Sequence, residues 1–184
     1  MTLELDVLRD AIARLERAGI DYMLTGSMAL AHYEQPRMTR DIDLVVALSV
    51  GDAGRVAALF SPDYYLSDEA AERAIRERGM FNILHLEKSV KLDLIVRKGT
   101  PYRQEEFARR RRVMLPGFEA WVVTREDLIL SKLVWAKDSA SELQLRDVRA
   151  LLATDPDLAY LGRWAAELSV SAALAVMLDA RHHS

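Results

Sequence analysis

The stretch RDIDLVV, residues 40–46, places two aspartates two positions apart at the start of an apolar run. The run is rich in Ile, Leu and Val, which predicts a strand over residues 41–48. Side chains alternate between the faces of a strand, so Asp41 and Asp43 share one face, with Cβ atoms roughly 6–7 Å apart. Two carboxylates at that separation can share hard divalent ions such as Mg²⁺. An Asp-x-Asp pair is also common by chance, and the alternative is a turn cap at Asp41 with an exposed Asp43.

A third aspartate occurs in a similar setting further along the chain. The stretch KLDLIV, residues 91–96, again has an acid near the start of an apolar strand. A charge in that position is costly unless it is paired or bound to a metal. On a neighbouring strand, Asp93 would complete a three-carboxylate cluster. The alternative is a salt bridge to Lys91, which lies two residues earlier on the same strand face.

Upstream of the acids, Gly26 and Ser27 form a turn between a strand over residues 22–24 and a helix over residues 28–33. Glycine lets a phosphate approach the backbone, and the following helix offers free N–H groups at its positive end. The hydroxyl of Ser27 can add a further hydrogen bond. Alone, Gly-Ser after a strand is only a tight turn. Ahead of an acid pair, it indicates a phosphate-binding site.

The remaining pattern predicts an α/β (α+β) fold, in which a small mixed sheet flanked by helices is followed by a helical C-terminal region. Residues 1–123 would form the catalytic domain, and residues 124–184 would pack on it as helices. A capping box at Thr124–Asp127 begins this second region. Further strands are predicted over residues 81–86, 90–96, 111–115 and 120–123, as two hairpins. Further helices are predicted over residues 5–15, 53–60, 68–78, 124–137, 141–153, 156–168 and 172–180.

Composition narrows the class of protein. The chain has 184 residues, of which 51% are hydrophobic and 29% charged, so it is long and apolar enough for a buried core. It has no cysteine, which excludes disulfides and thiolate metal sites. It shows no signal peptide and no apolar run of membrane-spanning length, so a soluble, cytoplasmic protein is expected. Arginine dominates the basic residues, which suits a phosphate-rich ligand and equally follows from high-GC coding.

Three ordered segments resemble the DNA-polymerase-β-type nucleotidyltransferase superfamily: GSMAL at residues 26–30, RMTRDIDL at 37–44 and KLDL at 91–94. In that family a Gly-Ser or Gly-Gly turn precedes an Asp-x-Asp strand, and a third Asp lies on a later strand. Residues 81–85, 127–133 and 146–148 are similar to the minimal bacterial branch with AbiE-type toxin components of toxin–antitoxin pairs. The catalytic motifs cover the first half of the chain, and the branch resemblance extends to about Trp164.

The resemblance implies a role for each matching residue. Gly26 and Ser27 would hold the β- and γ-phosphates of a nucleoside triphosphate. Asp41 and Asp43 would bind the metal on the triphosphate, and the pair would share a second Mg²⁺ or Mn²⁺ with Asp93. Asp93 would also orient or deprotonate the acceptor hydroxyl. Two such ions stabilise the attacking and leaving oxygens of an in-line displacement.

Four further residues are supporting candidates. Lys132 interrupts an apolar helix face, where it either extends to solvent or meets an anion, and the resemblance assigns it to the triphosphate. Asp147 on the next helix would pair with Lys132 and orient it, with a neighbouring surface arginine as the equal alternative. Arg40, beside the acids, would balance their charge or contact phosphate. Thr39 would support the same loop.

The expected activity is Mg²⁺-dependent transfer of NMP from an NTP to a hydroxyl, either an RNA 3′ end (such as that of tRNA) or a protein side chain. On the toxin interpretation, a cognate antitoxin is a partner. The alternatives are nucleotidylation of a small molecule such as an antibiotic, and a non-catalytic nucleotide- or partner-binding module. The arginines at residues 109–112 would guide an RNA backbone or form a solvated face. The helical tail allows a homodimer, and Trp135 is expected in the core.

Overall fold

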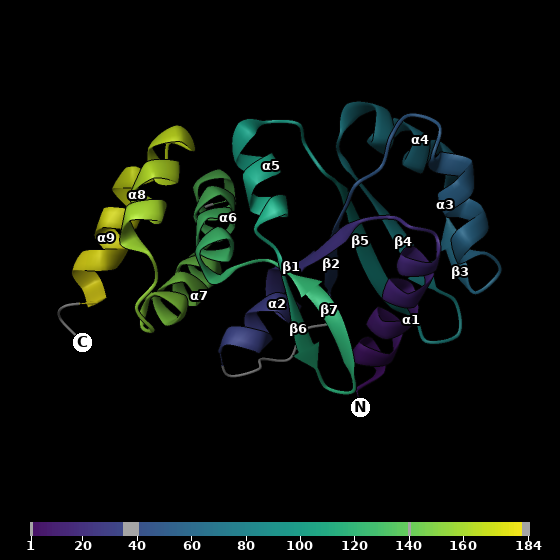
Figure 1. Ribbon diagram of the computed structural model, residues 1–184, viewed down its shortest axis with the longest axis horizontal. Coiled ribbons are helices and arrows are strands. Elements are labelled where there is room, and N and C mark those ends of the chain that lie inside the picture. The colour runs from purple at the N-terminus through teal and green to yellow at the C-terminus, as the bar shows by residue number, and fades with distance from the viewer. Residues whose placement is uncertain (1, 35–40, 140, 182–184) are drawn as a thin grey trace.

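The computed structural model describes residues 2–34, 41–139 and 141–181, which form a mixed sheet with helices around it (Figure 1). The strands are β1 (Tyr22–Thr25), β2 (Ile42–Val46), β3 (Tyr64–Leu66), β4 (Met80–His85), β5 (Val90–Val96), β6 (Arg111–Leu115) and β7 (Phe118–Val122). The helices are α1 (Leu3–Arg17), α2 (Gly26–Tyr33), α3 (Ala53–Phe60), α4 (Asp68–Glu77), α5 (Pro101–Ala108), α6 (Arg125–Ser139), α7 (Glu142–Leu152), α8 (Leu158–Glu167) and α9 (Ser171–Arg181). The predicted α+β class is confirmed.

The sheet has the strand order β3-β4-β5-β2-β1-β7-β6. The pairs β2–β5 and β1–β7 are parallel, and the other neighbours are antiparallel. Both predicted hairpins, β4–β5 and β6–β7, are present. The central position of β2 between β1 and β5 brings the two acid-bearing strands together, although β3, α4 and other elements separate them in sequence.

Strand alternation gives the central sheet two different faces. Ile42 and Leu44 of β2 and Leu92 and Leu94 of β5 are fully buried on one face, where each apolar side chain contributes about 1.5–3 kcal/mol on burial. Helix α1 packs against β5 and α3, and α4 packs against β4. The odd-numbered residues of β2 and β5, including Asp43 and Asp93, lie on the opposite face.

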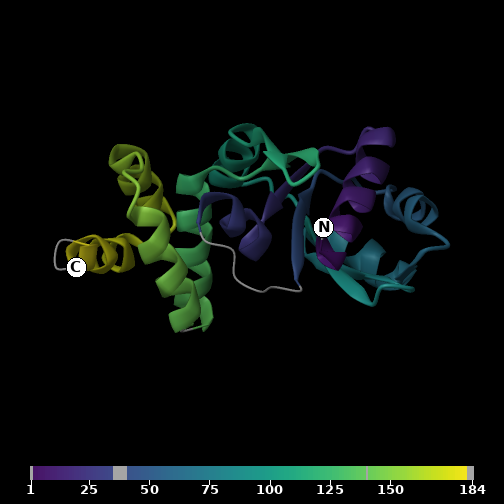
Figure 2. The ribbon, with the colours of Figure 1, turned by 90° about the horizontal axis from the view of Figure 1, so that it is seen from below.

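The helical C-terminal region extends from the other side of the sheet. Figures 1 and 2 show α6–α9 gathered at one end of the molecule, with α1, α3 and α4 at the other. Helix α2 lies against β1 and β2, and α6 packs on α2. The first turn of α6 is capped as predicted, because Thr124 Oγ1 accepts from the backbone N–H of Asp127 and donates to its carboxylate.

Two elements were not predicted. The strand β3 has only three residues, and α5 begins at Pro101, a residue suited to a first helical turn. Helix α5 buries Tyr102, Glu106 and Phe107, so a carboxylate lies within its inner face. Within the described residues, every helix is too short or too polar to cross a bilayer.

Candidate active site

The turn between β1 and α2 places the backbone of Gly26 against the carboxylate of Asp43. Gly26 has a φ of +64°, which glycine adopts at little cost. A Cβ at this position would lie 2.8 Å from Cγ of Asp43 and closer still to its Oδ2. Thr25, the preceding residue, pairs with Asp43 across β1 and β2. Both conformation and space therefore require glycine, and the turn adjoins the acid pair.

Ser27 follows in the first turn of α2 and is half-buried. The first N–H groups of a helix have no partner within the helix, and they carry the positive end of its dipole. The turn therefore offers backbone donors and a hydroxyl next to carboxylates. This combination suits a phosphate that is itself bound to a cation.

Asp43 and Asp93 are direct neighbours on two parallel strands. The register of β2 and β5 pairs Asp43 with Asp93, and adjacent strands lie about 4.8 Å apart. Both residues are only 8% exposed. Asp41 precedes β2 by one residue, and its side chain is 67% exposed. Two buried carboxylates thus lie side by side, and the third lies at the rim.

This clustering changes the acidity of Asp43. Burial is the largest cause, and repulsion from Asp93 and Asp41 adds to it, so that the pKa of Asp43 rises to about 6. The positive charges of Lys91 and Lys132 act in the opposite direction. The fold therefore holds a negative charge where its own environment disfavours it. A bound cation would stabilise that charge.

Lys91 and Asn82 hold the carboxylate of Asp93. The ammonium of Lys91 lies 3.1 Å from Oδ1 of Asp93 and 4.0 Å from Oδ1 of Asp41. Asn82, which pairs with Asp93 across β4 and β5, donates from Nδ2 to Oδ1 of Asp93. The salt bridge that competes with the metal-site interpretation is thus present, and so is the juxtaposition of Asp93 with Asp43. The two occur together.

Lys132 is buried and paired. Its Nζ donates to Oδ2 of Asp147 at 2.8 Å and to Oε1 of Gln144 at 3.0 Å, and the side chains of Lys132 and Asp147 are each 5% exposed. The ion pair with Asp147 is therefore present, and the exposed position for Lys132 is excluded. The positive charge of Lys132 acts to lower the pKa of Asp43, so this lysine is part of the electrostatics of the site.

Thr39 and Arg40 lie outside the described residues, as does Arg37. The segment of residues 35–40 joins α2 to β2, immediately before Asp41. The predictions that Thr39 supports this loop and that Arg40 balances the acids or contacts phosphate therefore stay predictions.

The donor set fits a hard divalent ion. Asp41, Asp43 and Asp93 supply only carboxylate oxygens, which Mg²⁺ and Mn²⁺ prefer. Within residues 2–34, 41–139 and 141–181, no group of three or more carboxylate or imidazole side chains is already arranged around one point as a metal site. The pair Asp43–Asp93 is in place. The exposed side chain of Asp41 lies at the rim, 4.0 Å from the ammonium of Lys91.

The arginine run at residues 109–112 is largely engaged within the chain. The guanidinium of Arg109 lies over the ring of Tyr160, 3.9 Å from the ring centroid. Ion pairs join Arg109 to Asp127 at 3.4 Å, Arg110 to Asp21 at 3.1 Å and Arg112 to Glu119 at 3.0 Å. Arg111 is exposed. Three of the four arginines therefore have structural partners, which leaves little of the run for an RNA backbone.

Asn82 and Gln144 are site residues that the sequence analysis missed. Counting across the predicted hairpin, whose strands end at residue 86 and begin at residue 90, puts Ile83 opposite Asp93. In the structure His85 pairs with Val90, and this shift of one residue brings Asn82 opposite Asp93. Gln144 had no such signal, because its contact with Lys132 depends on how α6 and α7 pack. Asn and Gln are neutral, so a search of the sequence for charged catalytic or metal-binding residues does not select them.

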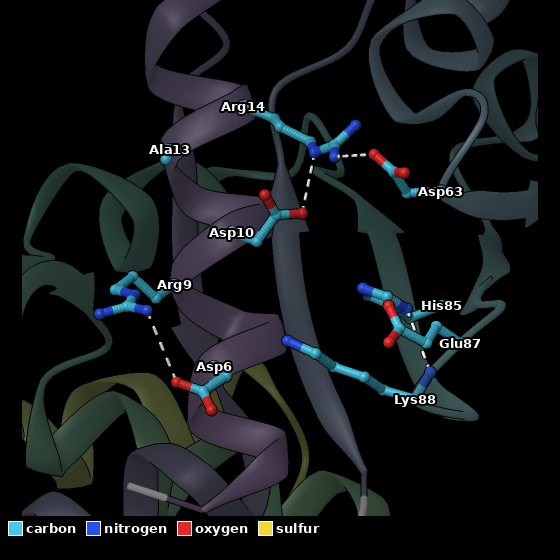
Figure 3. Close-up of a pocket in the computed structure, with 9 residues that line it drawn as sticks. All are labelled: Asp6, Arg9, Asp10, Ala13, Arg14, Asp63, His85, Glu87 and Lys88. Atoms are coloured by element: carbon cyan, nitrogen blue, oxygen red, sulfur yellow. Dashed lines mark hydrogen bonds and ion pairs between the residues drawn. The ribbon is translucent and has the colours of Figure 1, made fainter.

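A separate charged hollow lies on the other side of the sheet, between α1 and the β4–β5 hairpin (Figure 3). His85 on its wall alternates with Asn82 along β4 and so faces away from the three aspartates. Arg14 in this hollow already binds Asp10 and Asp63, and Arg9 pairs with Asp6. The charges of these residues are thus largely neutralised by one another.

Three solved structures are similar to this chain in fold and distant from it in sequence. The antibiotic-resistance factor ANT(2'')-Ia gives a TM-score of 0.58 at 15% identity, over 97% of this chain and 94% of that one. The lincosamide antibiotic adenylyltransferase LnuA, in its lincomycin-bound form, gives 0.57 at 14% identity, over 84% and 98%. An antigenic nucleotidyltransferase-like protein from Paracoccidioides brasiliensis gives 0.57 at 17%, over 91% of each chain.

No family model matches the sequence, and no curated protein matches it either. At these identities the likeness is one of fold, and it covers both the sheet and most of the C-terminal helices. The chain therefore has the nucleotidyltransferase fold.

Proposed function

We propose that this protein is a metal-dependent nucleotidyltransferase that moves NMP from an NTP to a hydroxyl acceptor. The observation that carries the proposal is the pairing of Asp43 with Asp93 on adjacent parallel strands, directly beside the Gly26 turn. Neighbours of the same fold include LnuA, which is described as a lincosamide antibiotic adenylyltransferase, and this supports the same chemistry. Each element of the site has a role in the proposed reaction.

The triphosphate would bind at the turn and under α6. The backbone N–H groups of the first turn of α2 and the hydroxyl of Ser27 would hold the β- and γ-phosphates. Lys132, held by Asp147 and Gln144, would offset the negative charge of the triphosphate. Because this lysine is buried and fixed, little conformational entropy would be lost when it binds the substrate.

The three aspartates would serve the transfer step. Divalent ions at Asp41, Asp43 and Asp93 would supply Lewis-acid stabilisation of the attacking and leaving oxygens. The oxygen of the acceptor hydroxyl forms a bond to the α-phosphorus, the bond from that phosphorus to the bridging oxygen breaks, and pyrophosphate leaves. Asp93 would accept the proton of the hydroxyl. Asn82, through its hydrogen bond to Oδ1 of Asp93, would keep that carboxylate oriented toward the acceptor.

Two classes of acceptor follow from different observations. The resemblance to AbiE-type components favours a macromolecular hydroxyl, such as an RNA 3′ end or a protein side chain. The likeness to ANT(2'')-Ia and LnuA, which are described as acting in antibiotic resistance or on lincosamides, favours a small molecule. With most of residues 109–112 engaged internally, the arginine run adds little support for RNA.

Incubation with α-labelled NTPs and Mg²⁺ tests the proposal and identifies the acceptor. Total RNA, a protein lysate, an aminoglycoside and a lincosamide are offered in separate reactions, beside an Asp41→Ala, Asp43→Ala double variant whose folding is checked by circular dichroism. The proposal expects label transfer to one acceptor class by the wild type alone. Transfer that persists in the folded double variant would reject this site, and no transfer to any class would reject the activity.

The toxin role is tested separately in cells. Induced expression would arrest growth, and a neighbouring antitoxin gene product would relieve the arrest. Expression of the double variant at the same level provides the control. Normal growth with fully active protein would contradict the toxin role and leave the transferase activity in place.

A further inference from the structure

Lys91 occupies the space between two of the three aspartates. It precedes Asp93 by two residues on β5, so strand alternation places both side chains on one face. Its Nζ lies 3.1 Å and 3.2 Å from the two carboxylate oxygens of Asp93, and 4.0 Å from Oδ1 of Asp41. A cation of this chain therefore already sits where a cation is expected to bind.

The acid cluster needs such a charge when no metal is bound. Asp93 is buried beside the equally buried Asp43, and like charges at this separation repel each other strongly. The ammonium of Lys91 offsets this repulsion. The hydrogen bond from the Lys91 ammonium to Oδ2 of Asp93, 3.2 Å long, holds the two opposite charges together.

The two lysines near the site differ in their freedom to move. Lys132 is enclosed and held by both Asp147 and Gln144. The side chain of Lys91 is 46% exposed, and its long flexible chain can extend into solvent at little cost. Lys132 is thus a fixed charge, whereas Lys91 is a charge that can leave.

We propose that Lys91 is an exchangeable counter-ion, which balances Asp93 and Asp41 in the metal-free protein and must withdraw before a divalent ion binds there. Lys91 therefore sets the metal concentration at which the site fills. The inference rests on the proposed function only in that the aspartates bind divalent ions, and it does not depend on the nucleotide or the acceptor.

Mn²⁺ titration without nucleotide, followed by calorimetry, tests the exchange. Lys91→Met removes the charge with little change of shape, and Lys91→Arg retains it. Lys88→Met is the matched control, because Lys88 lies on the same hairpin but lines the hollow on the opposite face (Figure 3). Lys91→Met is expected to tighten Mn²⁺ binding by about tenfold, as expected when a close competing charge is removed. Lys91→Arg and Lys88→Met should stay near wild type.

Two further measurements separate exchange from an ordinary structural salt bridge. Lys91→Met should lower the melting temperature in EDTA while it tightens metal binding, whereas a purely structural lysine would lower the first and leave the second unchanged. Mn²⁺ should also speed acetylation of the Lys91 amine, followed by mass spectrometry with Lys88 as internal reference.

Any one of three results would be enough to overturn the proposed role of Lys91. Unchanged or weaker Mn²⁺ binding by Lys91→Met, an acetylation rate that does not respond to Mn²⁺, or no Mn²⁺ binding by any of the proteins would overturn it. Tighter binding by the variant together with an absence of nucleotidyl transfer would support the exchange and reject the proposed function.

Discussion

Gly26 and Asp43 lie so close together that a methyl group on Gly26 would overlap the carboxylate of Asp43. The contact joins the turn before α2 to the acid pair, so the geometry of one depends on the other. Gly19, at the end of α1, has the same φ of +64° but no atom within 4 Å of a Cβ. The chain thus contains a matched pair of glycines that separates backbone strain from crowding.

Gly26→Ala should therefore destabilise the protein more than Gly19→Ala does. Both variants incur the cost of a positive φ, roughly 1 kcal/mol, and crowding against Asp43 should add about 1–3 kcal/mol to the first alone. Urea denaturation gives both free energies of unfolding. Gly26→Ala should also lose transfer activity while Gly19→Ala keeps it. Equal losses of stability would mean that Asp43 does not fill the space beside the turn.

Asp43→Asn should stabilise the metal-free protein at neutral pH. The pKa of Asp43 is about 6 in the folded protein and 3.8 is its ordinary value, so the folded state binds the proton more tightly. The stability that the protonated group contributes is complete below pH 4 and is lost as the pH rises through 6. In EDTA at pH 7.5 the variant should gain up to about 2–3 kcal/mol over wild type, and the gain should vanish near pH 4. A variant less stable than wild type at pH 7.5 would contradict the account.

Replacing either Lys132 or Asp147 alone should destabilise the protein far more than replacing both. Removing one partner leaves a buried charge uncompensated, which costs about 3–5 kcal/mol. Lys132→Met and Asp147→Leu should each show that loss in denaturation, and the double variant should recover most of it. Transfer activity should stay absent in the double variant, because no ammonium faces the triphosphate. Activity that returns with stability would show that the pair only supports the fold.

Arg109 and Arg111 should behave differently despite lying two residues apart. Arg109→Ala loses the ion pair with Asp127 and the contact with Tyr160, and should cost about 1–3 kcal/mol, as expected for a charge-assisted contact to a buried acid. Arg111→Ala should change the free energy of unfolding by less than about 0.5 kcal/mol, as for most exposed sites. If RNA is the acceptor, its KM should rise only for Arg111→Ala. A stability loss for Arg111→Ala equal to that for Arg109→Ala would contradict this assignment.

Much of the fold could be predicted because local signals agreed with the final packing. Residues 53–60 form the helix that their spacing predicts, and the Thr124 cap begins α6 at the expected place. The strand β3 was missed because three residues are too few to show an alternation. Helix α5 was missed because its buried face includes Glu106, whose charge is compensated by Arg103 and whose Oε1 also accepts a hydrogen bond from Ser131. Compensation of that kind has no local sequence pattern.

The prediction that Trp135 lies in the core was wrong, because its side chain is 55% exposed. The buried face of α6 runs through Ile129, Leu133 and Ala136, and Trp135 falls to one side of it. Helical spacing groups residues on a face, but it does not say which part of that face a neighbouring element covers.

For the site, the sequence predicted which residues carry charge but not how they are paired. Strand alternation placed Asp43 and Asp93 on a common face only once β2 and β5 were known to be neighbours, and that adjacency depends on the whole sheet. From the sequence, the salt bridge to Lys91 and the acid cluster are alternative environments for Asp93. The structure contains both, because Asp93 pairs with Asp43 on the neighbouring strand and its carboxylate also contacts Lys91 on its own strand.

Metal stoichiometry tests the central claim most directly. Mn²⁺ binding is followed by electron paramagnetic resonance with non-hydrolysable α,β-methylene triphosphates of each base, for the wild type, Asp43→Asn and Asp93→Asn. The account predicts two bound Mn²⁺ ions per chain for the wild type with the preferred nucleotide, one for Asp93→Asn and none retained tightly for Asp43→Asn. The same Mn²⁺ stoichiometry and affinity in all three proteins would contradict it.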